Sequence, residues 1–306
     1  MKRILSTIVL FASIGSAGYC AAGTDGAAFL NVEINPRANS LGEAYTSVPS
    51  AGALEASRNP AGLANLEKSE VAFGYYQRPL DLRFNTLAYA QRVRPWDMVF
   101  GVNMFYADYG SQDETQVDVG NDQGIKTGSF RASDRLACLS ASKLFREQIA
   151  VGANLKVFQQ SIQSVNGLGY AFDLGGLYAV KNRPWNIGMA LRNIGPEYSF
   201  GGTQVQLPMG YSVGSSYSFF SKALLLSADL EKIKNDTWRL KGGVEYNLRQ
   251  KFFVRVGHTG HSDEGMQMFV FGGGVNLYGY VLDYSFDPFD VLGQSHRIAL
   301  RYHFGK

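Results

Sequence analysis

The chain has 306 residues, among them 35 glycines, 17 tyrosines and 20 phenylalanines, and its formal net charge is +3. This charge is too small and too scattered to indicate a nucleic-acid partner, so none is expected. Beyond the N-terminal segment, no stretch approaches the roughly 18 consecutive apolar residues of a transmembrane helix. The composition indicates a β-rich, aromatic chain.

Residues 1–22 have the pattern of a secretory signal peptide. Lys2 and Arg3 form a positively charged start, an apolar run covers residues 4–14, and Ala22 fits the last position before a cleavage site. The apolar run is too short to cross a bilayer as a helix. We therefore expect an exported protein whose mature chain begins directly after this segment.

The two cysteines lead to separate expectations. Cys20 suggests an alternative, lipid attachment at the cleavage site, but Tyr19 stands where that signal prefers a small residue. Once the signal peptide is removed, only Cys138 remains, so no intramolecular disulfide is expected. Cys138 falls within a strand pattern and is interpreted as an ordinary small residue.

Residues 23–68 show no alternation and are rich in glycine, alanine and small polar side chains. Near their end, the stretch ASRNPAGLANLE contains three residues that favour a tight turn. Asn59 can bond to its own backbone, Pro60 fixes its φ angle, and Gly62 permits a sharp reversal of the chain.

From residue 69 onward, apolar and polar residues alternate in 14 segments, most of them about 9 to 15 residues long, as expected of tilted membrane strands. In the last segment Ile298, Leu300 and Tyr302 share one face, and Arg297 and Arg301 share the other. A soluble β-sandwich would bury the first face, whereas a transmembrane barrel would turn it toward lipid. The alternation alone does not separate these two folds.

The lengths of the connections do separate them. If the first strand runs outward, the inner connections are tight and several are basic, while the outer ones are longer and mostly acidic or glycine-rich. This asymmetry is typical of outer-membrane barrels. The sequence therefore predicts an all-β fold, a 14-stranded antiparallel transmembrane barrel of residues 69–306 in the bacterial outer membrane, with both termini on the periplasmic side. The expected outer loops include residues 111–126, 195–205, 233–236, 261–265 and 287–294.

A barrel of this width is not filled by its own side chains. Residues 23–68 are therefore expected to lie in the lumen as a plug, with the Asn59–Pro60–Gly62 turn at its end. Glu55 and Arg58 would then be candidates to pair with charges on the barrel wall.

The lumen-facing side of the strands carries ten charged residues. Neighbouring strands are expected to bring Asp229 near Arg239 or Lys241, and Asp283 near Arg297 or Arg301. Such cross-strand pairs would stiffen the wall; alternatively, some of these charges hold the plug or meet a polar head group. The ten residues are Lys156, Asp173, Asp229, Arg239, Lys241, Glu245, Arg255, Asp283, Arg297 and Arg301.

Aromatic residues mark the expected membrane interface. RPWDMVFGV and RPWNIGMAL repeat a turn followed by tryptophan, so Trp96 and Trp185 are expected in an interfacial aromatic girdle, with core packing as the alternative. The chain closes on HRIALRYHF, an alternating strand that ends at Phe304 and is similar to the C-terminal signal of outer-membrane proteins. The expected partners are therefore outer-membrane lipid and the barrel-assembly machinery.

No set of residues predicts an enzyme, and no cofactor or metal is expected. His258 and His261 could form a weak metal pair at the outer rim, but no carboxylate or cysteine joins them at ligand spacing. No nucleophile elbow is present. The glycines of FGGGVNL lack the following helix of a phosphate loop, so they are expected to bend a strand or to let the plug approach its backbone.

The chain resembles the PorV/PorQ family, which belongs with the FadL-like 14-stranded barrels. The resemblance covers nearly the whole mature chain, from AAFLNVEINPRANSLGEAYTSVPSAGALEASRNPAGLANLE through GYAFDLGGLYAV, LPMGYSVGSSY and GYVLDYSF to HRIALRYHF. It implies one of two functions. PorV members accept cargo with a C-terminal signal in type IX secretion, whereas FadL-like members take up long-chain fatty acids or other hydrophobic compounds through a plugged barrel that opens sideways.

The first function expected is therefore type IX-like protein secretion or surface delivery, with a translocon and cargo proteins as partners. The compact outer loops depart from what a cargo shuttle would need. The alternative is transport of a hydrophobic small molecule, which the plug and the inward apolar residues Leu177, Leu225 and Phe253 favour. An open diffusion pore is the third possibility, and the plug argues against it.

Overall fold

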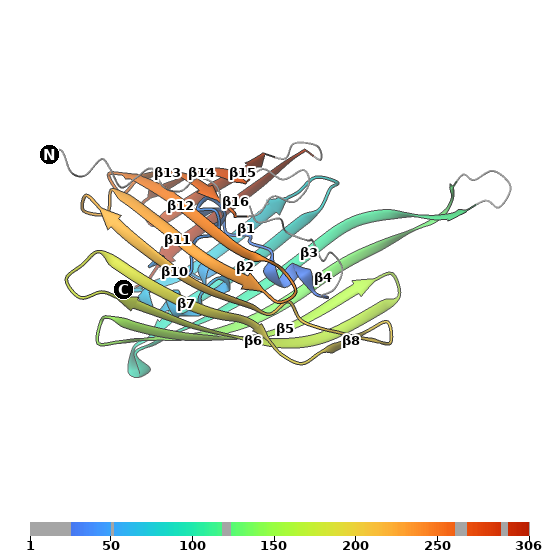
Figure 1. Ribbon diagram of the computed structural model, residues 1–306, viewed down its shortest axis with the longest axis horizontal. Helices are drawn as coiled ribbons and strands as arrows, with labels where there is room; N and C mark the ends of the chain where they lie inside the picture. Colours follow the sequence, from blue (N-terminus) through green and yellow to red (C-terminus); the bar gives the residue numbers. More distant parts are fainter. Residues whose placement is uncertain (1–25, 50–51, 118–123, 261–267, 289–292, 306) are drawn as a thin grey trace.

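The computed structural model describes residues 26–49, 52–117, 124–260, 268–288 and 293–305. Within them, fourteen antiparallel strands form a closed barrel in which β1 pairs with β16, so the predicted fold class is confirmed (Figure 1). The barrel strands are β1 (Ser69–Gln77), β2 (Arg83–Val93), β3 (Met98–Val117), β4 (Gly124–Phe145), β5 (Ile149–Ile162), β6 (Val165–Ala179), β7 (Trp185–Ile194), β10 (Gly210–Phe219), β11 (Leu224–Ile233), β12 (Trp238–Leu248), β13 (Phe252–His258), β14 (Phe269–Leu277), β15 (Tyr280–Pro288) and β16 (Gln294–Phe304).

Some sequence-based expectations concern residues outside the described ranges. These are the signal peptide at residues 1–22 with Cys20, the outer loop at 261–265 with His261, and the middle of the outer loop at 287–294. No helix among the described residues is long and apolar enough to cross a membrane.

The outer face of the barrel is apolar around its circumference. In β16, Ile298 and Leu300 are 45% and 47% exposed, whereas Arg297 and Ala299 on the alternate positions are buried. The same alternation recurs along the other strands. Large apolar side chains exposed on every strand would be costly in water and are stable against lipid. This exterior places the barrel in the bacterial outer membrane.

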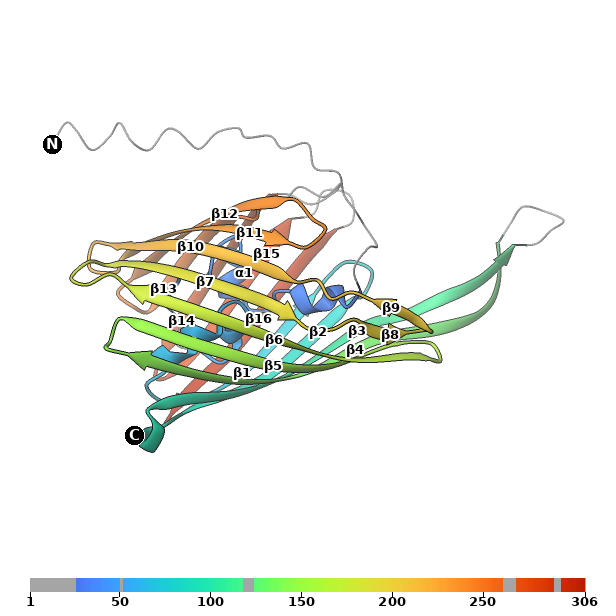
Figure 2. The ribbon, with the colours of Figure 1, turned by 60° about the horizontal axis from the view of Figure 1, so that its bottom comes forward.

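The prediction that residues 111–126 form an outer loop, the longest one, is wrong. β3 and β4 continue pairing as far as Val117 and Gly124, and Figures 1 and 2 show this hairpin projecting well beyond the barrel. We call its free part, residues 109–117 and 124–131, the arm. Beyond the membrane both faces of a strand meet water, so the apolar alternation that marks membrane strands is lost although the pairing persists.

The other outer connections also differ in detail from the prediction. The expected loop at 195–205 contains a small two-stranded sheet of β8 (Tyr198–Phe200) and β9 (Thr203–Val205), joined by Gly201 and Gly202 at positive φ. The outer connection between β5 and β6 is a tight turn at residues 163–164, so the outer side is not uniformly long-looped.

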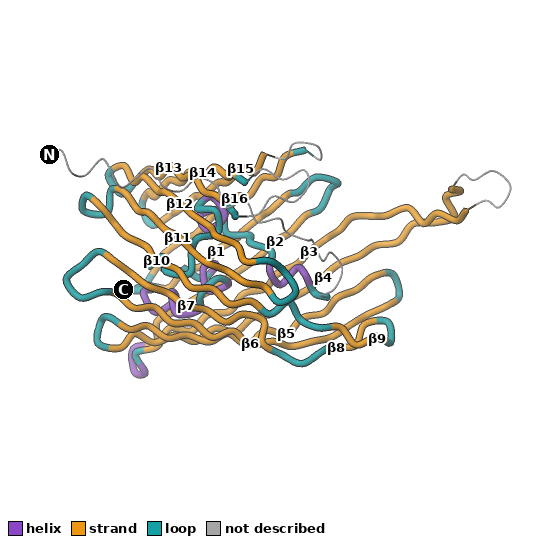
Figure 3. The backbone as a smooth tube through the Cα atoms, viewed as in Figure 1, coloured by secondary structure: helices purple, strands orange, loops and turns teal. Residues whose placement is uncertain are grey.

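The N-terminal segment lies inside the barrel, and we call its described residues, 26–49 and 52–68, the plug. It contains four short helices, which Figure 3 draws in purple between the strands. Leu41 and Leu63 are completely buried even though the barrel that surrounds them faces lipid on its outside. A further short helix, η4 (Arg94–Trp96), forms the turn between β2 and β3. The plug helices are η1 (Ala28–Asn31), α1 (Pro36–Ser40), η2 (Leu54–Ser57) and η3 (Pro60–Asn65).

Candidate functional site: the plug and the barrel wall

The turn before η3 connects the plug to itself and to the wall. Asn59 caps η3, because its Oδ1 accepts a hydrogen bond from the Ala61 N–H at 3.0 Å. Its Nδ2 donates to the Thr46 carbonyl of the plug at 2.7 Å. The same nitrogen lies 3.2 and 3.3 Å from the carbonyl oxygens of Gly176 and Met189 on the wall. One buried amide therefore joins two plug segments to two wall strands.

Two wall glycines allow this turn to touch the sheet. A Cβ added to Gly152 would overlap the Pro60 carbonyl and the Ala61 nitrogen, and one added to Gly175 would overlap the Asn59 side chain. Both glycines lie on the inward face, on β5 and β6. Any larger residue at either position would push the turn away from the wall.

Six charged residues form the first plug–wall network, which we call the Arg37 network. The plug's Arg37 donates two hydrogen bonds to Glu245, at 2.9 and 3.0 Å. At the other end of the network, Arg301 donates to the plug's Glu55 at 3.0 Å, and Glu55 lies 3.9 Å from Arg37. Wall pairs at 2.6 to 2.7 Å link these two ends, so plug and wall share one chain of alternating charges. Its members are Arg37, Glu245, Arg255, Asp283, Arg301 and Glu55.

The second network is centred on Arg58 of the plug and is called the Arg58 network. Arg58 bonds to Glu33 at 2.6 Å and to Glu231 of the wall at 3.2 Å, and it also pairs with Glu43. Lys241 bonds to Glu43 at 2.8 Å and pairs with Glu231. Arg192 of β7 completes the set by pairing with Glu231. Three carboxylates and three cations thus meet in a site that is almost entirely shielded from solvent.

The plug carboxylates of the Arg58 network have opposite pKa shifts. Burial alone would raise the pKa of Glu43, but Arg58 and Lys241 hold that pKa well below its ordinary value. Burial raises the pKa of Glu33 in spite of the neighbouring Arg58. The anionic form of Glu43 is therefore the one that belongs to this network.

Asp229 lies opposite Lys241 in the register of β11 and β12, as the sequence predicted, but its hydrogen-bond partners belong to the plug. Its Oδ2 accepts the backbone N–H groups of Tyr45 and Thr46 at 2.9 and 2.8 Å. Lys241 bonds to the Arg58 network instead, and Arg239 pairs with Asp236 in the adjacent turn. The plug supplies backbone donors at this point of the wall, and sequence alternation carries no information about them.

The remaining lumen-facing charges also contact partners inside the barrel. Lys156 lies 2.7 Å from Asp173, next to Asn154, which donates to the Ala56 carbonyl of the plug at 2.9 Å. Arg297 donates to the Glu33 carbonyl at 2.8 Å and pairs with Asp287. Of the predicted alternatives for Asp283, Arg301 is its partner and Arg297 is not.

The predicted aromatic and apolar positions lie on both faces of the wall. Trp96, Trp185 and Phe304 are exposed on the exterior, at the end of the barrel with tight turns. Leu177 and Leu225 are buried against the plug, and Phe253 is half-buried. Cys138 is buried, and His258 accepts a hydrogen bond from the Gly260 N–H at 3.1 Å. No group of potential metal ligands occurs among the described residues.

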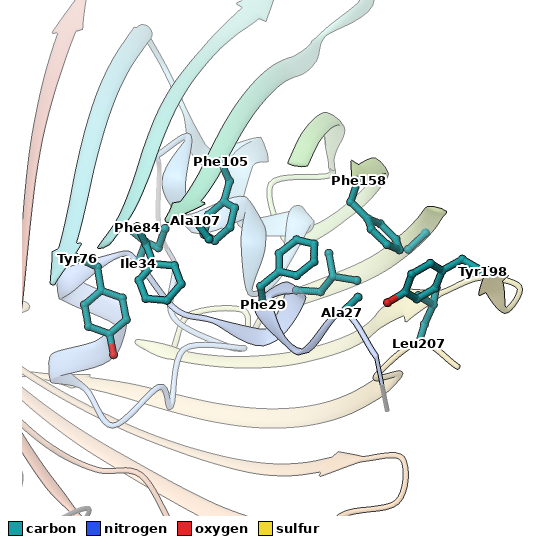
Figure 4. Packing of buried hydrophobic residues seen from close by; sticks show 12 residues of the cluster. Ala27, Phe29, Ile34, Tyr76, Phe84, Phe105, Ala107, Phe158, Tyr198 and Leu207 are labelled. Carbon is teal, nitrogen blue, oxygen red and sulfur yellow. The ribbon is translucent and has the colours of Figure 1, made fainter. Parts of the chain in front are cut away.

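An aromatic cluster between plug and wall went unrecognised in the sequence. Figure 4 shows Phe29 of η1 among rings from β1, β2, β3 and β5 and from the outer loop that contains Tyr198. Its centroid lies 5.8 Å from those of both Phe105 and Phe158. Phe84 and Tyr198 extend the cluster on either side, at 6.1 Å from Phe105 and 5.2 Å from Phe158. The sequence did contain a signal for this cluster, namely large aromatic residues on the inward face, where small or polar residues are common.

Comparisons with known proteins agree with this architecture. Residues 22–172 match the model of an uncharacterised protein family (UPF0164). No curated protein sequence matches the chain. Among solved structures, the Ralstonia pickettii toluene transporter TbuX superposes with a TM-score of 0.65 at 14% identity, covering 90% of this chain and all of that one. The P. putida toluene transporter TodX gives 0.63 at 12% identity, covering 88% and 98%.

A shortened TodX, the deltaS2S3 mutant described as a monoaromatic hydrocarbon channel, gives a TM-score of 0.62 at 14% identity and covers 85% and 96% of the two chains. At such low identity these likenesses concern the fold. The chain therefore has the fold of the FadL-like 14-stranded outer-membrane barrels, closed by an N-terminal plug.

Proposed function

We propose that this barrel takes up small hydrophobic compounds across the outer membrane, with the plug as its gate. The aromatic cluster carries the proposal, because it gives the plug an apolar contact that a ligand can replace. Apolar contacts are non-directional, so a hydrophobic molecule can take the place of Phe29 against Phe105 and Phe158. The fold shared with the toluene transporters TbuX and TodX supports the same substrate class.

The geometry of the cluster favours flat aromatic molecules. Phe29 stacks on Phe105 with 20° between the ring planes and meets Phe158 edge-on at 73°. A one-ring hydrocarbon can reproduce both contacts, since stacked and edge-to-face arrangements are the preferred ones between aromatic groups. The neighbouring Arg37 and Arg58 networks are balanced by their own countercharges and offer no comparable site for an ionic solute.

Uptake requires the plug to move, since it occupies the lumen. The apolar contact around Phe29 can be lost and regained with a ligand at little net change in buried area. Separating Arg58 from Glu33, Glu43 and Glu231 would leave its buried guanidinium unpaired, which costs several kcal/mol. We expect the residues around η1 to move first while the Arg58 network holds the rest of the plug in place.

The test is uptake of radiolabelled toluene by cells that lack their own hydrocarbon channel. Cells expressing the protein should take it up faster than vector controls, and Phe158→Ala should reduce the rate. Phe145→Ala, on the lipid-facing exterior, is the matched control and should leave uptake unchanged. Equal uptake with and without the protein would overturn the proposal.

Protein secretion of the PorV/PorQ kind is the second candidate. The arm favours it, because this ribbon gives an external protein a surface that the compact loops do not. Deleting the gene should then leave exported cargo in the periplasm. Normal surface display in the deletion strain would exclude this role.

A further inference from the structure

The tight-turn end of the barrel carries an arc of exposed cations. Four consecutive turns around the barrel, between β4 and β5, β6 and β7, β10 and β11, and β12 and β13, contain six of them and one exposed carboxylate, Glu147. Within the described part of the chain, none of the six makes an ion pair. We call this set the cationic arc; its members are Arg146, Lys181, Arg183, Lys222, Arg249 and Lys251.

The opposite end of the barrel is different. Two of the five exposed cations described there are paired with carboxylates, Lys126 with Asp113 at 2.6 Å and Arg83 with Asp81 at 3.8 Å; the other three are Arg131, Arg135 and Lys234. Exposed carboxylates there also include Glu114 and Glu197. The excess of positive charge is therefore a property of one end.

Aromatic side chains fix the level of the arc relative to the bilayer. Phe145, Tyr178, Trp185, Phe219 and Phe252 lie on the lipid-facing side at the ends of the same strands, each 37% to 49% exposed. Exposed aromatic residues in such positions sit at the head-group level. Every cation of the arc is within three residues of one of these rings, or about 10 Å along the chain. The charges therefore lie beside lipid phosphates rather than deep in the aqueous phase.

A neighbouring contact shows a cation already drawn to this interface. Lys143 places its Nζ 5.7 Å from the centroid of the Phe145 ring and donates to the Trp96 carbonyl at 3.2 Å. The ammonium group therefore lies beside the aromatic residues, as expected of a side chain that snorkels to the interface.

We propose that the cationic arc binds the anionic phospholipid head groups of the periplasmic leaflet. The unpaired charges, their contiguity over four turns and their position beside the aromatic girdle point to this one occupant. Each basic residue close to an anionic membrane surface strengthens the attraction to that surface about fivefold. The proposal is independent of what the barrel transports.

Trp185 provides the reporter, because it lies within the arc, while Trp238 at the other end of the barrel provides an internal reference. The full-length protein is prepared with Trp185 alone (Trp96→Phe and Trp238→Phe) or Trp238 alone (Trp96→Phe and Trp185→Phe). Each is placed in vesicles of phosphatidylethanolamine containing a minor fraction of brominated phosphatidylglycerol. Quenching of Trp185 should exceed that of Trp238 several-fold at low salt, and the excess should fall as salt is added.

The arc variant changes its six cations to glutamine in the Trp185-only protein and should lose this excess. A matched control, with Arg83, Lys126, Arg131, Arg135 and Lys234 changed to glutamine, should keep it. Heat-modifiable migration on gels verifies that each variant forms the barrel. Equal quenching of Trp185 and Trp238 in the protein with the unaltered arc would overturn the proposal, and so would an excess that survives in the arc variant. The arc would then be assigned to binding of an acidic periplasmic macromolecule instead of lipid.

Discussion

The two sides of the plug contact the barrel wall through different kinds of interaction, apolar on one side and ionic on the other. Around η1 the contact is made of rings and small apolar side chains from β1, β2, β3 and β5. Across the barrel, toward β7 and β11–β16, it consists of ion pairs and buried hydrogen bonds. The apolar contact tolerates substitution and small displacements, whereas each ion pair requires one geometry. The plug is thus built to loosen on one side and to stay attached on the other.

The largest effect is expected from Arg58→Ala. It leaves Glu33, Glu43 and Glu231 buried with only Lys241 and Arg192 to balance them. Breaking a buried pair in this way costs roughly 3–5 kcal/mol. Urea unfolding from lipid vesicles, followed by heat-modifiable migration, should report the loss. Arg83→Ala, which removes an exposed pair with Asp81, is the control and should change the midpoint little.

On the apolar side, Phe29→Ala should lower stability by roughly 3 kcal/mol, since it empties the centre of the aromatic cluster. Unlike Arg58→Ala, this loss should be partly recovered when toluene is added, because the ligand fills the vacated volume. Unfolding midpoints with and without saturating toluene measure the recovery. If toluene restored the stability of Phe29→Ala and Arg58→Ala equally, the distinction between an apolar and an ionic side of the plug would be contradicted.

The Asn59 turn is expected to contribute less to stability than either of these two contacts. Asn59→Ala removes the donor shared by Thr46, Gly176 and Met189 and the cap on the Ala61 N–H, which should cost roughly 1–3 kcal/mol. The plug should then be looser, and cells should admit bulky antibiotics more readily. Ser57→Ala, a nearby exposed position, is the comparison. Unchanged permeability in Asn59→Ala would mean that the turn does not hold the plug.

Acidification should have the smallest effect. Because the folded-state pKa of Glu43 is depressed, its contribution to stability is present at neutral pH and is lost only as the pH falls through that low value. Glu33, whose pKa is raised, has the opposite dependence and favours the folded state in acid. Antibiotic permeability should therefore stay constant from about pH 7 to pH 5. A sharp rise within this range would show that the Arg58 network is not the anchor.

Much of the barrel could be predicted from the sequence because lipid imposes a strict period of two on membrane strands. That rule predicts a shared face for Ile298, Leu300 and Tyr302, the lengths of the connections predict that this face meets lipid, and the structure confirms them on the exterior. Where lipid no longer acts, the rule fails. The arm has water on both faces, so its pairing from Ser111 to Val117 left no apolar pattern to read.

The contacts of the plug were less predictable, because short helices and turns have no period that fixes which side chain faces which strand. Arg37, Glu33 and Glu43 were therefore missed, although they are three of the five plug residues in the two networks. Arg192 and Glu231 had a usable signal. Arg192 is the one charged residue of β7, and Glu231 follows Asp229 by two positions on β11; both are in phase with the inward face of their strands.

Because the arm projects beyond the barrel, it is also the part of the described chain that molecules outside the cell contact first. From Asp108, the last β3 residue paired with β2, to Val117 the ribbon extends about 30 Å at the usual rise of a strand. Antibodies, phages and extracellular proteases approaching the cell would reach this ribbon before any other described part of the chain. It is also the natural place for an inserted epitope or fluorophore, since such an insertion leaves every plug contact untouched.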